Sequence, residues 1–216
     1  MINFYLKAKH WQLFILMLGI PLAYQIFALF QLFELQTLAP ATLDNNNGVG
    51  VTEVVNENLF YFDFFPYIMI VYIVIFFGWF WSMAIGLQKN IPSEITMKVQ
   101  KFKILFFIPL IYIILLMVFV GGLFSGMSTN SFSLIGWPLY IIVLLHLFSM
   151  FCIFYSMYFV AKSIKTAELK RKVGFGDFAG EFFLLWFYFI GIWIIQPKVN
   201  TLYKNANTTT KNSQIL

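Results

Sequence analysis

The sequence predicts an all-α integral membrane protein, a bundle of four transmembrane helices followed by a further apolar segment. Three observations support this fold class. Of 216 residues, 61% are hydrophobic and only 11% are charged, whereas soluble domains have about 45–50% apolar and about 25% charged residues. The mean hydropathy is +0.81. Long runs without any charge alternate with short basic segments. A water-soluble globular protein is therefore excluded.

The spans follow from the charge-free runs, which are residues 11–33, 64–88, 104–161 and 182–197. A helix that rises 1.5 Å per residue needs about 20 residues to cross a hydrocarbon core about 30 Å thick. The first run is longer than a signal-peptide core of about 7–15 residues, so we expect it to remain as a span. The third run is long enough for two spans. We expect transmembrane helices at about 11–33, 65–87, 104–124 and 138–161.

The last apolar segment, residues 182–196, has two interpretations. From Phe182 to Ile195 a helix would be about 21 Å long, too short to cross the membrane comfortably. Gly191 lies in the middle of the segment and Pro197 follows it. The segment is therefore either re-entrant, dipping into the membrane and returning, or a short fifth span.

Lysine and arginine placement indicates the orientation, because basic residues favour the cytoplasmic side. The N-terminal segment, the loop 88–103 and the loop 162–181 are basic, while residues 34–63 hold five acidic residues and no basic one. We expect a cytoplasmic N-terminus. A re-entrant segment would also leave the three lysines of the tail in the cytoplasm, which favours that alternative. Residues 1–197 then form a single membrane domain, and residues 198–216 form a polar cytoplasmic tail.

Small residues in the second span predict close helix packing. Gly78, Ser82 and Gly86 are spaced four residues apart, so they line one face of a helix. In lipid, helices associate through small residues that let backbones approach. Packing within the bundle is the simpler interpretation, and an interface for a second protein or a solute path is the alternative.

Two polar residues lie inside the predicted spans at a similar depth. Gln25 and His146 are each about 12 Å from the outer end of their span, so we expect a hydrogen bond between them. Polar groups in hydrocarbon need partners, and interhelical contact is the simplest role for this pair. A proton relay is the alternative, although relays usually include carboxylates within the membrane.

A second polar group is predicted at the inner membrane edge. Asp177 and Glu181 precede the last apolar segment, where a first-turn acid stabilises a helix start. With His10 they could instead form a polar site for a divalent cation or a proton. Gly174 to Asp177 also spells the GxGD motif of intramembrane aspartyl proteases, but that chemistry needs a second aspartate nearby, and Asp44 and Asp63 belong to the opposite loop.

The remaining polar features suggest no catalysis. A basic run is expected to continue the fourth span and to attract anionic lipid; it comprises Lys162, Lys165, Lys170, Arg171 and Lys172. It has no groove-reading or aromatic elements beside it, so we expect no nucleic-acid binding. The single cysteine, Cys152, excludes a disulfide framework and a cysteine-based metal site. We predict no cofactor, no metal site and no catalytic residue.

Two stretches of the chain resemble a known family. Lys9 to Phe14 (KHWQLF), and the segment from Gly176-Asp177-Phe178 through Leu185-Trp186-Phe187 and Gly191-Ile192-Trp193 to Gln196-Pro197, resemble an uncharacterised family of small multi-pass membrane proteins from Bacteroidota. This chain has Tyr188 or Phe189 where the family pattern has a proline. The resemblance implies a bacterial inner (cytoplasmic) membrane location and brings no activity with it.

The sequence thus favours a non-catalytic multi-pass protein that acts as a subunit or scaffold of a membrane complex. Its expected surroundings are the lipid bilayer and either a membrane-protein partner or further copies of itself. The alternatives are a small transporter or channel-type protein that uses Gln25 and His146, or a membrane enzyme that uses His10, Asp177 and Glu181.

Overall fold

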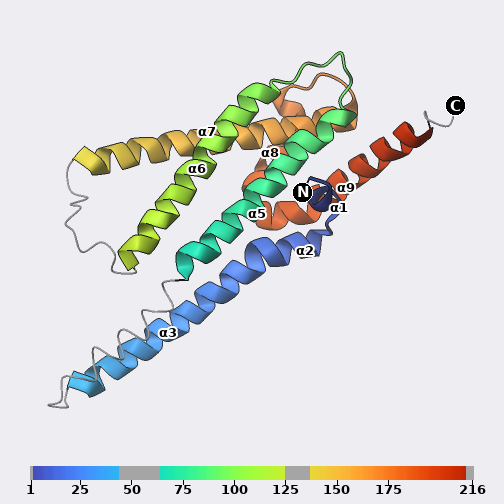
Figure 1. Ribbon diagram of the computed structural model, residues 1–216. Helices are drawn as coiled ribbons and strands as arrows, with labels where there is room; N and C mark the ends of the chain where they lie inside the picture. The colour runs from blue at the N-terminus through green and yellow to red at the C-terminus, as the bar shows by residue number, and fades with distance from the viewer. Residues whose placement is uncertain (1, 44–63, 125–136, 213–216) are drawn as a thin grey trace.

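The computed structural model describes residues 2–43, 64–124 and 137–212, and these residues fold into helices joined by short connections (Figure 1). Residues 44–63 of the acidic loop expected outside the membrane, and residues 125–136 of the Gly- and Ser-rich break, lie outside the described residues. The first part of that expected loop, residues 34–43, continues the helix of the first span. The helices are α1 (Ile2–Lys7), α2 (His10–Phe14), the π-helix η1 (Ile15–Gly19), α3 (Ile20–Leu43), α5 (Phe65–Gly86), the 3₁₀ helix η2 (Leu87–Asn90), α6 (Val99–Phe124), α7 (Trp137–Leu169), α8 (Phe175–Trp186) and α9 (Tyr188–Asn212).

In the described part of the chain, four helical segments are long and apolar enough to cross a membrane, so the predicted fold class is confirmed. They are His10–Gln31, Phe65–Asn90, Val99–Phe119 and Tyr140–Leu169. Their places agree with the four spans expected at about 11–33, 65–87, 104–124 and 138–161. The protein is therefore an all-α membrane protein with a helical bundle.

The first of these segments changes its helical winding part-way. The π-turn η1 comes directly before Pro21 in α3, whose nitrogen has no hydrogen to donate to the helix ladder. From there α3 projects away from the other helices (Figure 1). Only 11% of this segment's most apolar window is buried within the protein, compared with 39% for the segment that contains α5.

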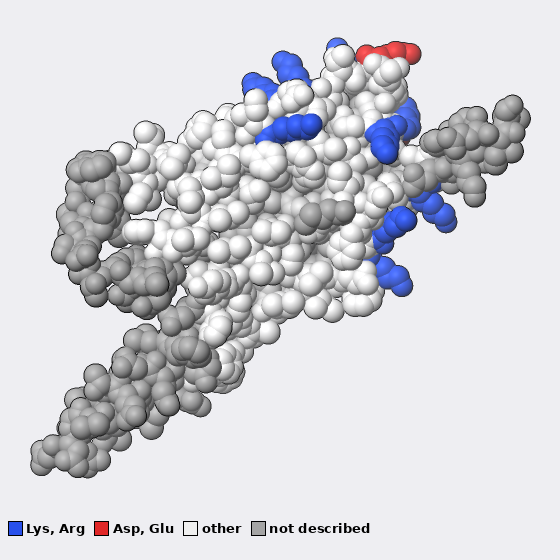
Figure 2. Space-filling model, in the orientation of Figure 1, with Lys and Arg blue, Asp and Glu red and all other residues white. Residues whose placement is uncertain are grey.

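One end of the bundle carries the charges. On the face shown in Figure 2, the lysine and arginine side chains gather at the end where α5 finishes and α6 begins. We call this the charged end. The opposite end, toward which α3 and the beginning of α7 extend, is called the far end.

The short helix α1 packs on the small-residue face of α5. A Cβ atom added at Gly78 would lie 2.7 Å from the hydroxyl oxygen of Tyr5, and one added at Gly86 would lie 2.4 Å from Cδ1 of Leu6. The side chains of Tyr5 and Leu6 thus pack directly on the two glycines, and an alanine at either position would have to displace them. The predicted packing face is thus occupied by the chain's own N-terminus.

The C-terminal apolar segment forms a helical hairpin. Helix α8 ends at Trp186, Phe187 adopts φ −91° and ψ 57°, and α9 turns back beside α8. At this turn a Cβ added to Gly191 would lie 1.8 Å from the carbonyl oxygen of Leu184, so only glycine fits. Pro197 lies inside α9, which continues to Asn212. The first part of the polar tail is therefore helical, and Val199 within it is buried.

The buried side chains concentrate toward the charged end. Trp79 of α5, Phe102 of α6, Ile164 of α7, Phe178 of α8 and Ile192 of α9 are all almost fully buried. Phe102 stacks on Phe159 of α7 with ring centroids 4.5 Å apart. The hairpin, α5, α6 and the second half of α7 thus form one packed core, and the polar residues discussed below surround it.

Candidate functional site

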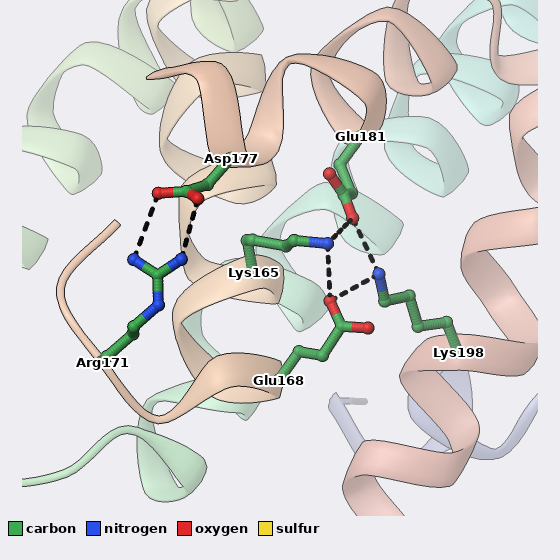
Figure 3. A network of polar contacts seen from close by, with 6 residues as sticks. All are labelled: Lys165, Glu168, Arg171, Asp177, Glu181 and Lys198. Carbon is green, nitrogen blue, oxygen red and sulfur yellow. Dashed lines mark hydrogen bonds and ion pairs between the residues drawn. The ribbon is translucent and has the colours of Figure 1, made fainter. Parts of the chain in front are cut away.

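Four charged side chains meet where α7, α8 and α9 come together at the charged end (Figure 3). Lys198 Nζ lies 2.7 Å from Glu181 Oε1 and 2.7 Å from Glu168 Oε2. Lys165 Nζ lies 3.2 Å from the same oxygen of Glu181 and 3.1 Å from that of Glu168. Two cations thus share two carboxylates. We call these four residues the ion-pair cluster.

The cluster keeps Glu181 ionised although this residue is buried. Burial raises the pKa of its carboxyl group. The hydrogen bond from Lys198, a backbone hydrogen bond and the nearby lysine charges together lower this pKa by more than burial raises it, so the net pKa lies below the ordinary value of 4.5. A carboxylate held in this way has no proton to donate at neutral pH. The cluster is therefore suited to fastening three helices together.

Asp177 makes a separate ion pair at the start of α8. Its Oδ1 lies 2.9 Å from Arg171 Nη2, and its Oδ2 accepts a 2.9 Å hydrogen bond from the backbone N–H of Gly174. These two interactions, the backbone hydrogen bond first, lower the pKa of the carboxyl group. Asp177 thus has the first-turn position that the sequence suggested, with Gly174 as the N-cap residue.

His10 has different neighbours from the two acids with which the sequence grouped it. Its ring lies against Trp193 of α9, with centroids 4.7 Å apart. Glu181 is engaged by Lys165 and Lys198, and Asp177 by Arg171. Among the described residues, no group of three or more His, Cys, Asp or Glu side chains is placed to hold a metal ion.

A buried amide joins the N-terminus to the hairpin. Gln196 of α9 is fully buried and accepts a 2.8 Å hydrogen bond from the indole N–H of Trp79. Its own N–H groups donate to the carbonyl oxygens of Tyr5 (2.7 Å) and Ala8 (2.9 Å), and Asn200 also donates to Ala8. Because α1 ends here, these bonds satisfy carbonyl groups that have no partner within the helix.

The intramembrane histidine has a partner on α6. His146 Nδ1 lies 3.4 Å from the hydroxyl oxygen of Tyr112. Gln25, which the sequence suggested as its partner, is an exposed residue of α3. The contact to His146 is therefore interhelical, as expected for a polar residue in a span, and it joins α7 to α6.

The basic run after the fourth span is only partly free to meet lipid. Lys165 belongs to the ion-pair cluster, Lys170 donates to the carbonyl oxygen of Asn90, and Arg171 pairs with Asp177. Lys162 lies 5.9 Å from the ring centroid of Tyr158, and Lys172 is exposed. Much of this run therefore ties α7 to its neighbours.

Comparison with known proteins yields no relative: no protein-family model, curated protein or solved structure matches the chain. The functional argument therefore depends on the geometry described above.

Proposed function

We propose that this protein is a non-catalytic subunit or scaffold of a membrane complex, located in the bacterial inner membrane with its N-terminus in the cytoplasm. The observation that carries the proposal is the contrast between a packed charged end and largely uncovered helices at the far end. Large side chains are exposed around most of α7 before residue 152, and the most exposed of them, at 60–77%, lie along one face at Tyr140, Leu144, Leu147 and Phe151. On α3, Leu29, Phe30 and Phe33 are about two-thirds exposed.

These two helices offer the surface that a partner span would contact. The small-residue face of α5 is partly covered by α1, whose Tyr5 and Leu6 lie against Gly78 and Gly86, so α3 and α7 offer the larger uncovered surface for a second protein. The carboxylates of Glu168, Asp177 and Glu181 are held in ion pairs, which supports a structural role for the polar end. The gathering of basic residues at that end supports its cytoplasmic placement.

A site-specific photocrosslinker tests the proposal in native membranes. The crosslinking residue replaces Leu29 or Leu144, and Leu115 of α6, which is 63% exposed, is replaced as the control. A scaffold or subunit gives one discrete protein adduct from Leu29 or Leu144, formed with a second copy or with another membrane protein, and none from Leu115. Only lipid adducts at all three positions would contradict the proposal.

A further inference from the structure

A groove of about 750 Å³ lies along the side of the bundle between α1, α5 and α6. Most of its lining is apolar, with Val74, Phe77 and Trp81 on α5 and Phe106, Leu110 and Ile114 on α6. The volume falls within the range of about 300–1,000 Å³ that is usual for small-molecule sites. Because two membrane-spanning helices supply these walls, much of the groove lies at the level of the hydrocarbon core.

The groove ends in polar groups at the charged end. Lys89 lines it there, together with Asn3 and Tyr203, and the hydroxyl group of Tyr203 donates a 2.9 Å hydrogen bond to Oδ1 of Asn3. Lys89 is exposed, and no acidic residue in the described part of the chain forms an ion pair with it. The ammonium group of Lys89 is therefore available to a negatively charged ligand.

The length of the groove matches a lipid of one leaflet. From Val74 to Lys89 a helix rises about 22 Å, which exceeds the roughly 15 Å of half a hydrocarbon core. This distance accommodates an acyl chain and the headgroup region above it. One wall is fixed in place, because α1 is held against Gly78 and Gly86 and its last carbonyl groups are bound by Gln196.

We propose that this groove binds one anionic phospholipid of the leaflet at the charged end. One of its two acyl chains lies against Phe77, Phe106 and Leu110, and its phosphate lies beside Lys89. The charge of Lys89 selects an anionic headgroup over a zwitterionic one. The site is separate from the exposed faces of α3 and α7, so it adds a ligand to the protein and does not depend on the proposed partner.

Native mass spectrometry of the full-length protein, titrated with phosphatidylglycerol or phosphatidylcholine, tests the proposal. The first phosphatidylglycerol should bind about fivefold more tightly than the first phosphatidylcholine, the preference expected from one lysine facing an anionic lipid. Lys89→Gln should abolish this preference, and Lys98→Gln, an exposed lysine in the same connection that does not line the groove, should retain it.

Filling the groove tests its location. Val74→Trp and Ile114→Trp should each lose the first bound lipid, whereas Val71→Trp and Leu115→Trp, exposed positions of the same helices outside the groove, should keep it. Thermal unfolding identifies any variant that fails to fold, and the other groove variant then decides. Equal binding by groove and control variants, or a preference that survives Lys89→Gln, would overturn the proposal while leaving the crosslinking result at Leu29 and Leu144 unaffected.

Discussion

The two ends of this bundle use similar apolar residues in different ways. On the single helix α7, Ile164 near the charged end is fully buried, whereas Leu144 near the far end is 70% exposed. In lipid there is no hydrophobic force between helices, so close packing and polar contacts decide which surfaces meet. The charged end has both, in the α8–α9 hairpin, the ion-pair cluster and the Gln196 hydrogen bonds. Apolar composition therefore places a helix in the membrane but does not determine what the helix packs against.

The largest effect should come from closing the space at the hairpin turn. In Gly191→Val the new side chain would meet the carbonyl oxygen of Leu184, with its Cβ at 1.8 Å, so α9 could not return beside α8. We expect loss of a monodisperse folded protein in size-exclusion chromatography. Gly180→Ala in α8 is the matched control because nothing lies within 4 Å of an added Cβ there, and alanine favours a helix by about 0.5–1 kcal/mol. If Gly191→Val and Gly180→Ala were equally monodisperse in size-exclusion chromatography, the turn would have room for a side chain at residue 191, which would contradict this account.

Removing the buried amide should have the next largest effect. Gln196→Leu leaves the indole N–H of Trp79 and the carbonyl oxygen of Tyr5 without their partner, at a cost of about 1–3 kcal/mol for each buried group. A clear decrease in the melting temperature is expected. Gln100→Leu, an exposed position of α6, should change it little, and similar decreases in the two variants would argue against the network.

A pair of substitutions on α7 compares the two ends directly. Ile164→Ala should lower the free energy of unfolding by about 2 kcal/mol, near the lower end of the range for buried positions, because packing contacts with neighbouring helices are lost. Leu144→Ala at the far end should change it by less than about 0.5 kcal/mol. Denaturation in mixed micelles measures both values. A larger loss for Leu144→Ala would reverse the assignment of the packed end.

The smallest effect concerns pH. The pKa of Glu181 is lower in the folded protein than its ordinary value of 4.5, so its contribution to stability is complete above that value and is lost as the pH falls through the folded pKa. The melting temperature should therefore decrease on acidification below about pH 4.5. Glu181→Gln should reduce this decrease, while Glu94→Gln, an exposed position, should not.

The fold could be predicted because its signal is simple. A charge-free run of suitable length predicts a span regardless of which helix it contacts, and the four expected spans coincide with four long apolar helices. The helix break in the last segment was harder to place. Glycine and proline are the usual breakers, yet the chain breaks at Phe187 while Pro197 lies within α9.

The contacts of the candidate site were less accessible to sequence reasoning. The spacing of Gly78 and Gly86 indicated a packing face, but a helix as short as α1 leaves too little periodicity to identify it as the occupant. Glu181 and Lys198 are seventeen residues apart, and only the turn at Phe187 brings them together. The partner of His146 depends on the rotation of α6, which the pattern of apolar residues does not fix.

The central claim is that α8 and α9 form a hairpin that returns the chain to the charged end. It can be tested by placing single cysteines at Lys172 and at Lys204, in a background with Cys152→Ser, and labelling them with a membrane-impermeant maleimide. Right-side-out and inverted vesicles are compared. The hairpin predicts that both positions react in the inverted vesicles and neither in the right-side-out ones. Labelling of the two positions from opposite sides would show that the segment crosses the membrane and would contradict the claim.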